Sequence, residues 1–228
     1  MPPAPTELFR PTRPSAGRRY PALRRSASIR RAWEQARAAG AAYSPLMTSV
    51  HLLHAGYAGD RVGSSIVLVR DADALIVVDP GMVARRSLIL DPLAELRVVP
   101  EAVTHVFLSH HHPDHTVNIA LFPNAEVVDH WARYKDDLWL DHDGDGHHLS
   151  PGAQLWLTPG HTDEDATLVV EADDAVYAMT HLWWREDRTP EIDPLARDQA
   201  AIEVHRQRVL AAVDVVIPGH GGPFRVTG

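Results

Sequence analysis

A short histidine-rich segment, residues 109–115, contains the side chains of this chain that are best suited to metal chemistry. The spacing His-x-His-x-Asp-His is formed by His110, His112, Asp114 and His115. Imidazole and carboxylate groups bind zinc-like divalent ions at neutral pH. Residues two apart in an extended segment project to the same side, so His110 and His112 can hold one ion. Asp114 and His115 then face a neighbouring volume. The spacing therefore predicts two adjacent metal sites, an arrangement that supports hydrolysis.

The elements around this segment must place its side chains at the end of a strand. The apolar residues 103–108 directly precede it and predict a buried strand that ends at Ser109. Two further histidines, His161 and His220, each close a Pro-Gly-His turn that follows an apolar run. Strand ends on a rigid scaffold hold ligands in the fixed positions that a metal site needs. We therefore expect ligands at three strand ends.

Apolar, β-branched segments recur through the rest of the chain and are mixed with helix patterns. Two helices are expected, at 86–96 and at 198–212, from apolar residues at helical spacing. Strands mixed with helices favour sheets that are covered by helices. The predicted strands are 50–53, 65–69, 74–78, 103–108, 125–129, 155–157, 167–171, 175–178 and 213–217.

The charge of the chain is unevenly distributed. The net charge is −8, yet residues 1–46 hold nine arginines against Glu7 and Glu34, so the remaining residues carry −15. An acidic body repels polyanions, which argues against nucleic acid as the substrate, although the basic arm keeps that partner open. With no cysteine, disulfides and thiolate ligands are excluded, and a cytoplasmic location is expected.

The N-terminal arm, residues 1–46, is predicted to be an extension of the domain that begins at residue 47. Its first part, 1–21, is rich in proline and arginine and predicts extended or disordered chain. Residues 22–39 favour a helix that stops at Gly40. No run of about 18 apolar residues exists, so no membrane span is expected. An ordered arm could hold a homo-oligomer together.

The motifs of the body, taken in order, resemble the metallo-β-lactamase superfamily. The matching segments are Val-Val-Asp-Pro-Gly at 77–81, the histidine motif, Pro-Gly-His-Thr at 159–162 and Pro-Gly-His-Gly at 218–221. The resemblance covers residues 47–226 and implies an α+β fold, a four-layer αββα sandwich with metals at the edge of its two sheets. Residues 53–58 and 208–226 further resemble the metallo-β-lactamase domain-containing protein 1 subfamily, which has been linked to RNA processing.

The resemblance also implies roles for individual residues. One metal would be held by His110, His112 and His161. The second would be held by Asp114, His115 and His220. Asp79 would support a ligand from outside the metal's own contacts.

One position departs from the family pattern. An aspartate that bridges both metals is expected after the strand at 175–178, and His181 stands in its place. A neutral imidazole offers one lone pair, so it ligates one ion and does not bridge two. Three interpretations stay open: a terminal ligand in an altered dinuclear site, a mononuclear site, or a position that has lost ligation. Without the second carboxylate, the second ion should bind more weakly.

The function that these residues predict is a metal-dependent hydrolase of carbonyl substrates: an ester, thioester, lactone or amide. Zinc, as one or two ions, would supply hydroxide at neutral pH, with iron or manganese as alternatives. Asp114 would orient the nucleophile and handle the proton. Trp131, Trp183 and Trp184 would line a pocket for a small-molecule substrate with an apolar part.

Other functions fit the same motif. The basic arm and the subfamily resemblance favour an endoribonuclease or phosphodiesterase. A single iron would instead support an oxygenase. The substitution at His181 leaves a protein that binds metal or ligand without turnover as a fourth interpretation.

Overall fold

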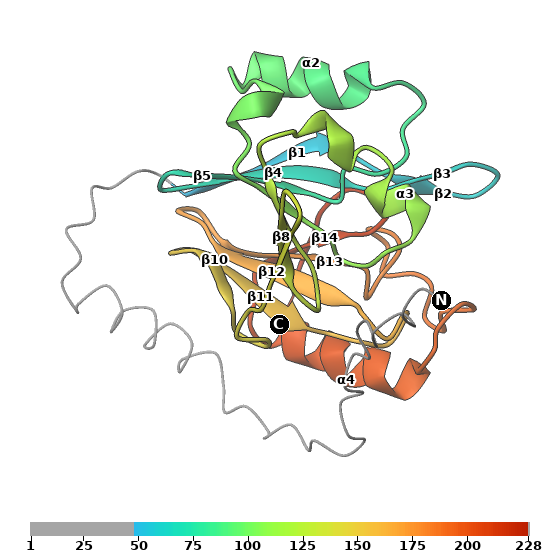
Figure 1. Cartoon of the computed structure of the whole chain (residues 1–228). Coiled ribbons are helices and arrows are strands. Elements are labelled where there is room, and N and C mark those ends of the chain that lie inside the picture. Colours follow the sequence, from blue (N-terminus) through green and yellow to red (C-terminus); the bar gives the residue numbers. More distant parts are fainter. Residues whose placement is uncertain (1–47, 228) are drawn as a thin grey trace, which may run out of the picture.

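Two β-sheets packed face to face form the centre of the molecule, with helices on both outer faces (Figure 1). The computed structural model describes residues 48–227. Helix α2 (Ser87–Glu95) covers one sheet and α4 (Gln199–Leu210) covers the other, which gives the layers α, β, β and α. The predicted αββα sandwich is therefore confirmed.

The first sheet has seven strands in the order β1-β4-β5-β6-β7-β8-β9. Strands β5, β6 and β7 are parallel, and the other neighbours are antiparallel. Parallel strands bring their carboxyl ends to the same edge, which is where the histidine motif follows β6. The strands are β1 (Ser49–His54), β4 (Ile66–Asp71), β5 (Ala74–Val78), β6 (His105–Phe107), β7 (Glu126–Val128), β8 (Arg133–Lys135) and β9 (Leu138–Leu140).

The second sheet has six strands in the order β10-β11-β12-β13-β14-β15. Strands β13 and β14 are parallel, and α4 makes the connection between them. The strands are β10 (His148–Ser150), β11 (Ala153–Leu157), β12 (Ala166–Glu171), β13 (Val176–Thr180), β14 (Val215–Pro218) and β15 (Phe224–Arg225). A small hairpin of β2 (Tyr57–Ala58) and β3 (Val62–Gly63) projects beside the first sheet.

Three apolar layers hold these elements together. The central layer lies between the sheets and includes Phe107, Leu155 and Leu168, all fully buried. A second layer packs α2 against the first sheet, and a third packs α4 against the second sheet. Removing so much apolar surface from water is the main force that fixes the sheets, and through them the loops at their edge.

The strands predicted from apolar runs, and both predicted helices, are present with ends no more than two residues from those expected. Six short strands, β2, β3, β8, β9, β10 and β15, were not predicted, because they are two or three residues long and most of their residues are half-exposed or exposed. The N-terminal arm and its predicted helix lie outside the described residues, so the boundary at residue 47 stays a prediction. Within residues 48–227, no helix is long and apolar enough to cross a membrane.

Candidate metal centre

Loops at the ends of five strands bring the candidate ligands together. The motif follows β6 and includes the short helix α3 (Pro113–Thr116). His112 is extended, with φ −63° and ψ 144°, and Pro113 then begins the helical turn. This change of backbone direction separates His110 and His112 from the later motif residues. The other contributors follow β11 (His161), β13 (His181), β14 (His220) and β5 (Asp79).

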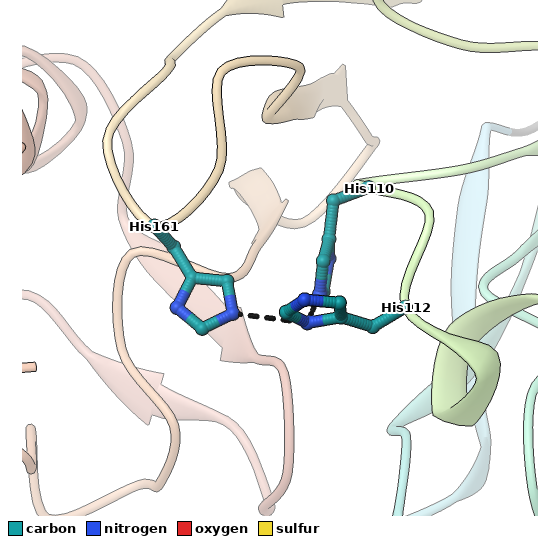
Figure 2. A group of neighbouring side chains, drawn as sticks. All are labelled: His110, His112 and His161. Carbon is teal, nitrogen blue, oxygen red and sulfur yellow. Dashed lines mark hydrogen bonds between the residues drawn. The ribbon is translucent and has the colours of Figure 1, made fainter. Parts of the chain in front are cut away.

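The first group of ligands consists of His110, His112 and His161, whose rings meet at one point (Figure 2). Nδ1 of His112 lies 3.0 Å from Nε2 of His110 and 3.2 Å from Nε2 of His161. A tetrahedral ion with Zn–N bonds of about 2.0–2.1 Å would have its ligand atoms about 3.3 Å apart. The nitrogen spacing therefore fits a zinc ion.

The hydrogen-bond partners show which nitrogens carry lone pairs. The Ser109 hydroxyl donates to Asp79, so its oxygen is left to accept from Nδ1 of His110 at 3.1 Å. Nδ1 of His161 donates to Oδ2 of Asp193 at 2.8 Å. In the neutral tautomer that these contacts favour, Nε2 of His110 and of His161 carries the lone pair. One hydrogen on His112 can satisfy only one of these nitrogens, whereas a cation satisfies all three.

The second group consists of Asp114, His115 and His220. Nδ1 of His115 donates to Asp79 at 2.8 Å, and Nδ1 of His220 donates to the Gly63 carbonyl at 3.0 Å. Their Nε2 atoms lie 3.5 and 3.6 Å from Oδ2 of Asp114. Three possible ligand atoms, two imidazole nitrogens and one carboxylate oxygen, thus converge within 4.8 Å of one another. Holding these polar groups together costs free energy when no cation is present, and a bound cation would stabilise them.

His181 lies beside both groups. Its ring centroid is 4.2 Å from that of His161 and 5.0 Å from that of His220. Nε2 of His181 is 3.0 Å from Nε2 of His220, while its Nδ1 is buried without a hydrogen-bond partner. An unsatisfied buried nitrogen costs about 1–3 kcal/mol. Gly219 permits this approach, since a Cβ there would lie 2.4 Å from Cδ2 of His181.

The surroundings of His110, His181 and His220 favour the neutral form of these three imidazoles. Burial, followed by the neighbouring histidines, lowers the pKa of His110 and of His181 well below the usual value. Burial and the nearby His115 lower the pKa of His220 to about 4. The neutral ring is the form that binds a metal. The site therefore presents ligands that need not lose a proton at neutral pH.

Asp79 connects the two groups. Its carboxylate accepts from the backbone N–H and the hydroxyl of Ser109, both at 2.7 Å, and from His115. Its φ of 48° is unusual for a residue other than glycine and marks local strain. Two residues later, Gly81 passes so close to the motif that a Cβ would lie 1.6 Å from the Asp114 carbonyl oxygen. Asp79 thus contacts a candidate ligand of the second group directly and one of the first group through Ser109.

The three predicted pocket tryptophans have different environments. Trp183 is 3% exposed and packs in the core under α4 against Phe224. It is therefore a core residue, and its prediction as a pocket residue is wrong. Trp184 is half-buried, with its ring 6.2 Å from that of His161. Trp131 is 54% exposed and lies 5.0 Å from the ring of His111, outside the ligand groups.

Two acidic residues near the site were not predicted. Asp193 contacts His161, and Asp129 holds the ring of His111 at 2.9 Å. Asp193 lies in an irregular segment between β13 and α4, where no periodic pattern fixes its direction. Its only signal in the sequence is its place before Pro194, which favours a turn.

The family model described as the metallo-beta-lactamase superfamily matches residues 59–221. The chain belongs to this superfamily. Among its members, a metallo-beta-lactamase domain-containing protein 1 from Xenopus laevis is 34% identical over 191 residues, which cover 78% of this chain and 82% of the relative. The Homo sapiens protein of the same name is 37% identical over 171 residues. Those residues cover 72% of this chain but 64% of the human protein, so the chain spans less than two thirds of it.

Solved structures of the metallo-beta-lactamase superfamily share the fold. A metallo-beta-lactamase from Thermotoga maritima superposes with a TM-score of 0.63 at 19% identity, covering 78% of this chain and 99% of the other. A dizinc quorum-quenching lactonase in complex with its product gives a TM-score of 0.52 at 18% identity, covering 69% and 72%. At these identities the likeness shows the fold alone.

Proposed function

We propose that this protein is a metal-dependent hydrolase that acts on a small carbonyl substrate, an ester, thioester, lactone or amide. The observation that carries the proposal is the convergence of two adjacent sets of three possible ligand atoms, imidazole nitrogens and a carboxylate oxygen, each set within 4.8 Å. Adjacent metals suit the attack of water on an electrophilic carbonyl. The fold relationship to a dizinc lactonase supports this class of reaction.

The residues that would hold the ions follow from the geometry. His110, His112 and His161 would hold one, and Asp114, His115 and His220 the other, with His181 as an additional ligand to one of them. Zinc is the proposed metal because the set is rich in imidazole, with iron or manganese as alternatives. When bound, zinc supplies Lewis acidity and lowers the pKa of its water toward 7.

The protein's own residues would then orient the metal ligands and protonate the leaving group. The Asp114 side chain is partly exposed, unlike the buried His115, so it can reach both a ligand position and the substrate. We assign it the transfer of a proton to the leaving group. Asp79 would orient the His115 ring, with Nε2 toward the ligand position, by accepting the hydrogen of Nδ1.

A carbonyl substrate fits the charges around the site better than a phosphodiester does. A pocket of about 300 Å³ opens beside His112 and His161, and its lining includes Asp163, Glu164 and Arg197. With two acidic residues and one basic residue, this opening would repel a polyanionic chain. An endoribonuclease would therefore depend on the basic arm to attract RNA.

The proposal can be tested by metal analysis together with a substrate panel. Protein purified without added metal should contain one to two transition-metal ions per chain, and it should hydrolyse at least one of an ester, thioester, lactone or amide. A bis-aryl phosphodiester and a short RNA complete the panel. Metal-free, correctly folded protein would refute the metalloenzyme. Turnover of RNA alone would replace the carbonyl substrate with a nuclease activity.

A further inference from the structure

Asp193 joins the first ligand group to a separate pocket. Its side chain is buried, and its Oδ2 accepts from Nδ1 of His161 at 2.8 Å and from Nε1 of Trp184 at 3.0 Å. One carboxylate oxygen thus holds both a candidate metal ligand and an aromatic ring. No other carboxylate among residues 48–227 is recorded with both contacts.

The remaining contacts of Asp193 are those of a side chain that positions its neighbours. Its Oδ1 accepts from the Leu195 backbone N–H at 2.8 Å, and its own N–H donates to Oε1 of Gln199 at 2.9 Å. The carboxylate therefore already accepts three hydrogen bonds. It also lies on the Nδ1 side of His161, whereas Nε2 faces His112.

Trp184 separates the ligand groups from an apolar pocket. Its ring lies 6.2 Å from that of His161 and 6.1 Å from those of His181 and His220. The same residue lines a pocket of about 400 Å³. The other lining residues are Ala58, Gly59, Arg185, Thr189 and Pro190. Their exposed surface in the pocket is mostly apolar.

We propose that Asp193 is a positioning residue that couples metal binding to the shape of this pocket, and that the pocket takes the apolar acyl part of the substrate. Through its single Oδ2, Asp193 holds the His161 ring with Nε2 toward His112 and holds the Trp184 ring at the pocket wall. The acyl assignment rests on the proposed hydrolase function. The metal half of the proposal does not depend on turnover.

The expected effects follow from the two hydrogen bonds. A carboxylate partner fixes the tautomer of a ligating histidine and raises its basicity, and its loss typically weakens metal binding by 10–100-fold. Without Asp193 the Trp184 indole also loses its acceptor, so the ring is free to move from the wall. Asp193→Ala should therefore change both the metal affinity and the shape of the pocket that Trp184 lines.

Cobalt(II) titration of the metal-free full chain tests the metal half. Asp193→Ala should bind cobalt about 10–100-fold more weakly, with an altered visible spectrum. Asp193→Asn, which keeps an acceptor, should recover part of this loss and guards against a variant that fails to fold. Trp184→Phe and Glu191→Gln, a matched control on the same loop, should bind cobalt like the wild type. Wild-type affinity and spectrum in Asp193→Ala would overturn the proposal.

Calorimetric binding of butyrate, hexanoate and octanoate tests the pocket half without turnover. Wild type should bind the longer carboxylates more tightly, and Trp184→Phe and Asp193→Ala should both flatten this chain-length dependence. Asp193→Ala that weakens cobalt binding but keeps the wild-type chain-length profile would overturn the coupling. A wild type that binds cobalt and octanoate yet hydrolyses no carbonyl substrate would refute the proposed function and leave the coupling intact.

Discussion

The two ligand groups are supported in different ways. The first group contains three imidazoles with nitrogens 3.0 and 3.2 Å apart, held from outside by Ser109 and Asp193. The second group includes the carboxylate of Asp114 at 3.5 and 3.6 Å from its histidines, held from outside by Asp79 and a backbone carbonyl. The first group is compact and contains only imidazoles, whereas the second includes a carboxylate and has a wider spacing.

His181 lies beside both groups, and the type of side chain at this position affects the charge of the site. It lies against histidines of both groups but adds no negative charge. Two divalent ions beside Asp114 alone would keep a net charge of +3, and a second carboxylate would reduce it. Repulsion between the ions is therefore relieved less than in a site with two carboxylates. Because His181 replaces a carboxylate, we expect the two sites to bind their ions at different metal concentrations.

Removing a ligand of the compact group should have the largest effect. His161→Ala is expected to lower the metal content by one ion and the rate of hydrolysis by more than about 100-fold. Losing only a hydrogen-bond partner of a metal ligand costs up to about 100-fold, and losing the ligand itself should cost more. Elemental analysis and turnover of the best panel substrate measure both. His148→Gln, an exposed histidine on β10, is the control. Unchanged metal content in His161→Ala would show that this group is not a metal site.

Removing the metal ions with a chelator should show whether the two groups bind them with different affinities. An ion that binds only the folded state stabilises it by about 2.7 kcal/mol when its concentration is 100 times its dissociation constant. Stepwise chelation should therefore lower the urea midpoint in two stages, with the weaker ion lost first. Urea denaturation at increasing chelator concentration measures this. A single stage, with both ions lost together, would contradict unequal sites.

Asp79→Asn should weaken both groups, because Asp79 contacts His115 directly and supports His110 through Ser109. We expect a loss of about 10–100-fold in metal affinity for each ion, measured by competition with a chromophoric chelator. Asp73→Asn, an exposed carboxylate in the turn after β4, is the matched control. A loss confined to one ion would show that the support through Ser109 is unimportant.

His181→Asp should produce the smallest change and the most specific one. The added carboxylate is expected to tighten the second ion by roughly tenfold, about 1.4 kcal/mol, and to leave the first nearly unchanged. Metal titration followed by elemental analysis distinguishes the two ions. Equal occupancy of the second ion in both forms would show that His181 does not weaken it.

Two adjacent tryptophans show how much of a side chain's environment can be predicted from the sequence. Trp183 and Trp184 have the same side chain and follow the same strand, yet one lies in the core and the other beside the histidines. The sequence did not distinguish the two and predicted both at the pocket. The packing of Trp183 with the residues under α4 separates them.

The sequence by itself determined the nine strands with apolar runs, the two main helices and the histidines at strand ends. Short-range signals were sufficient there, because apolar runs and Pro-Gly turns are local patterns. Only the tertiary structure decided that His181 lies against both groups and that Asp193 joins His161 to Trp184. These contacts connect segments up to 39 residues apart. The packing of the two sheets brings such segments together, and no local pattern in the sequence records it.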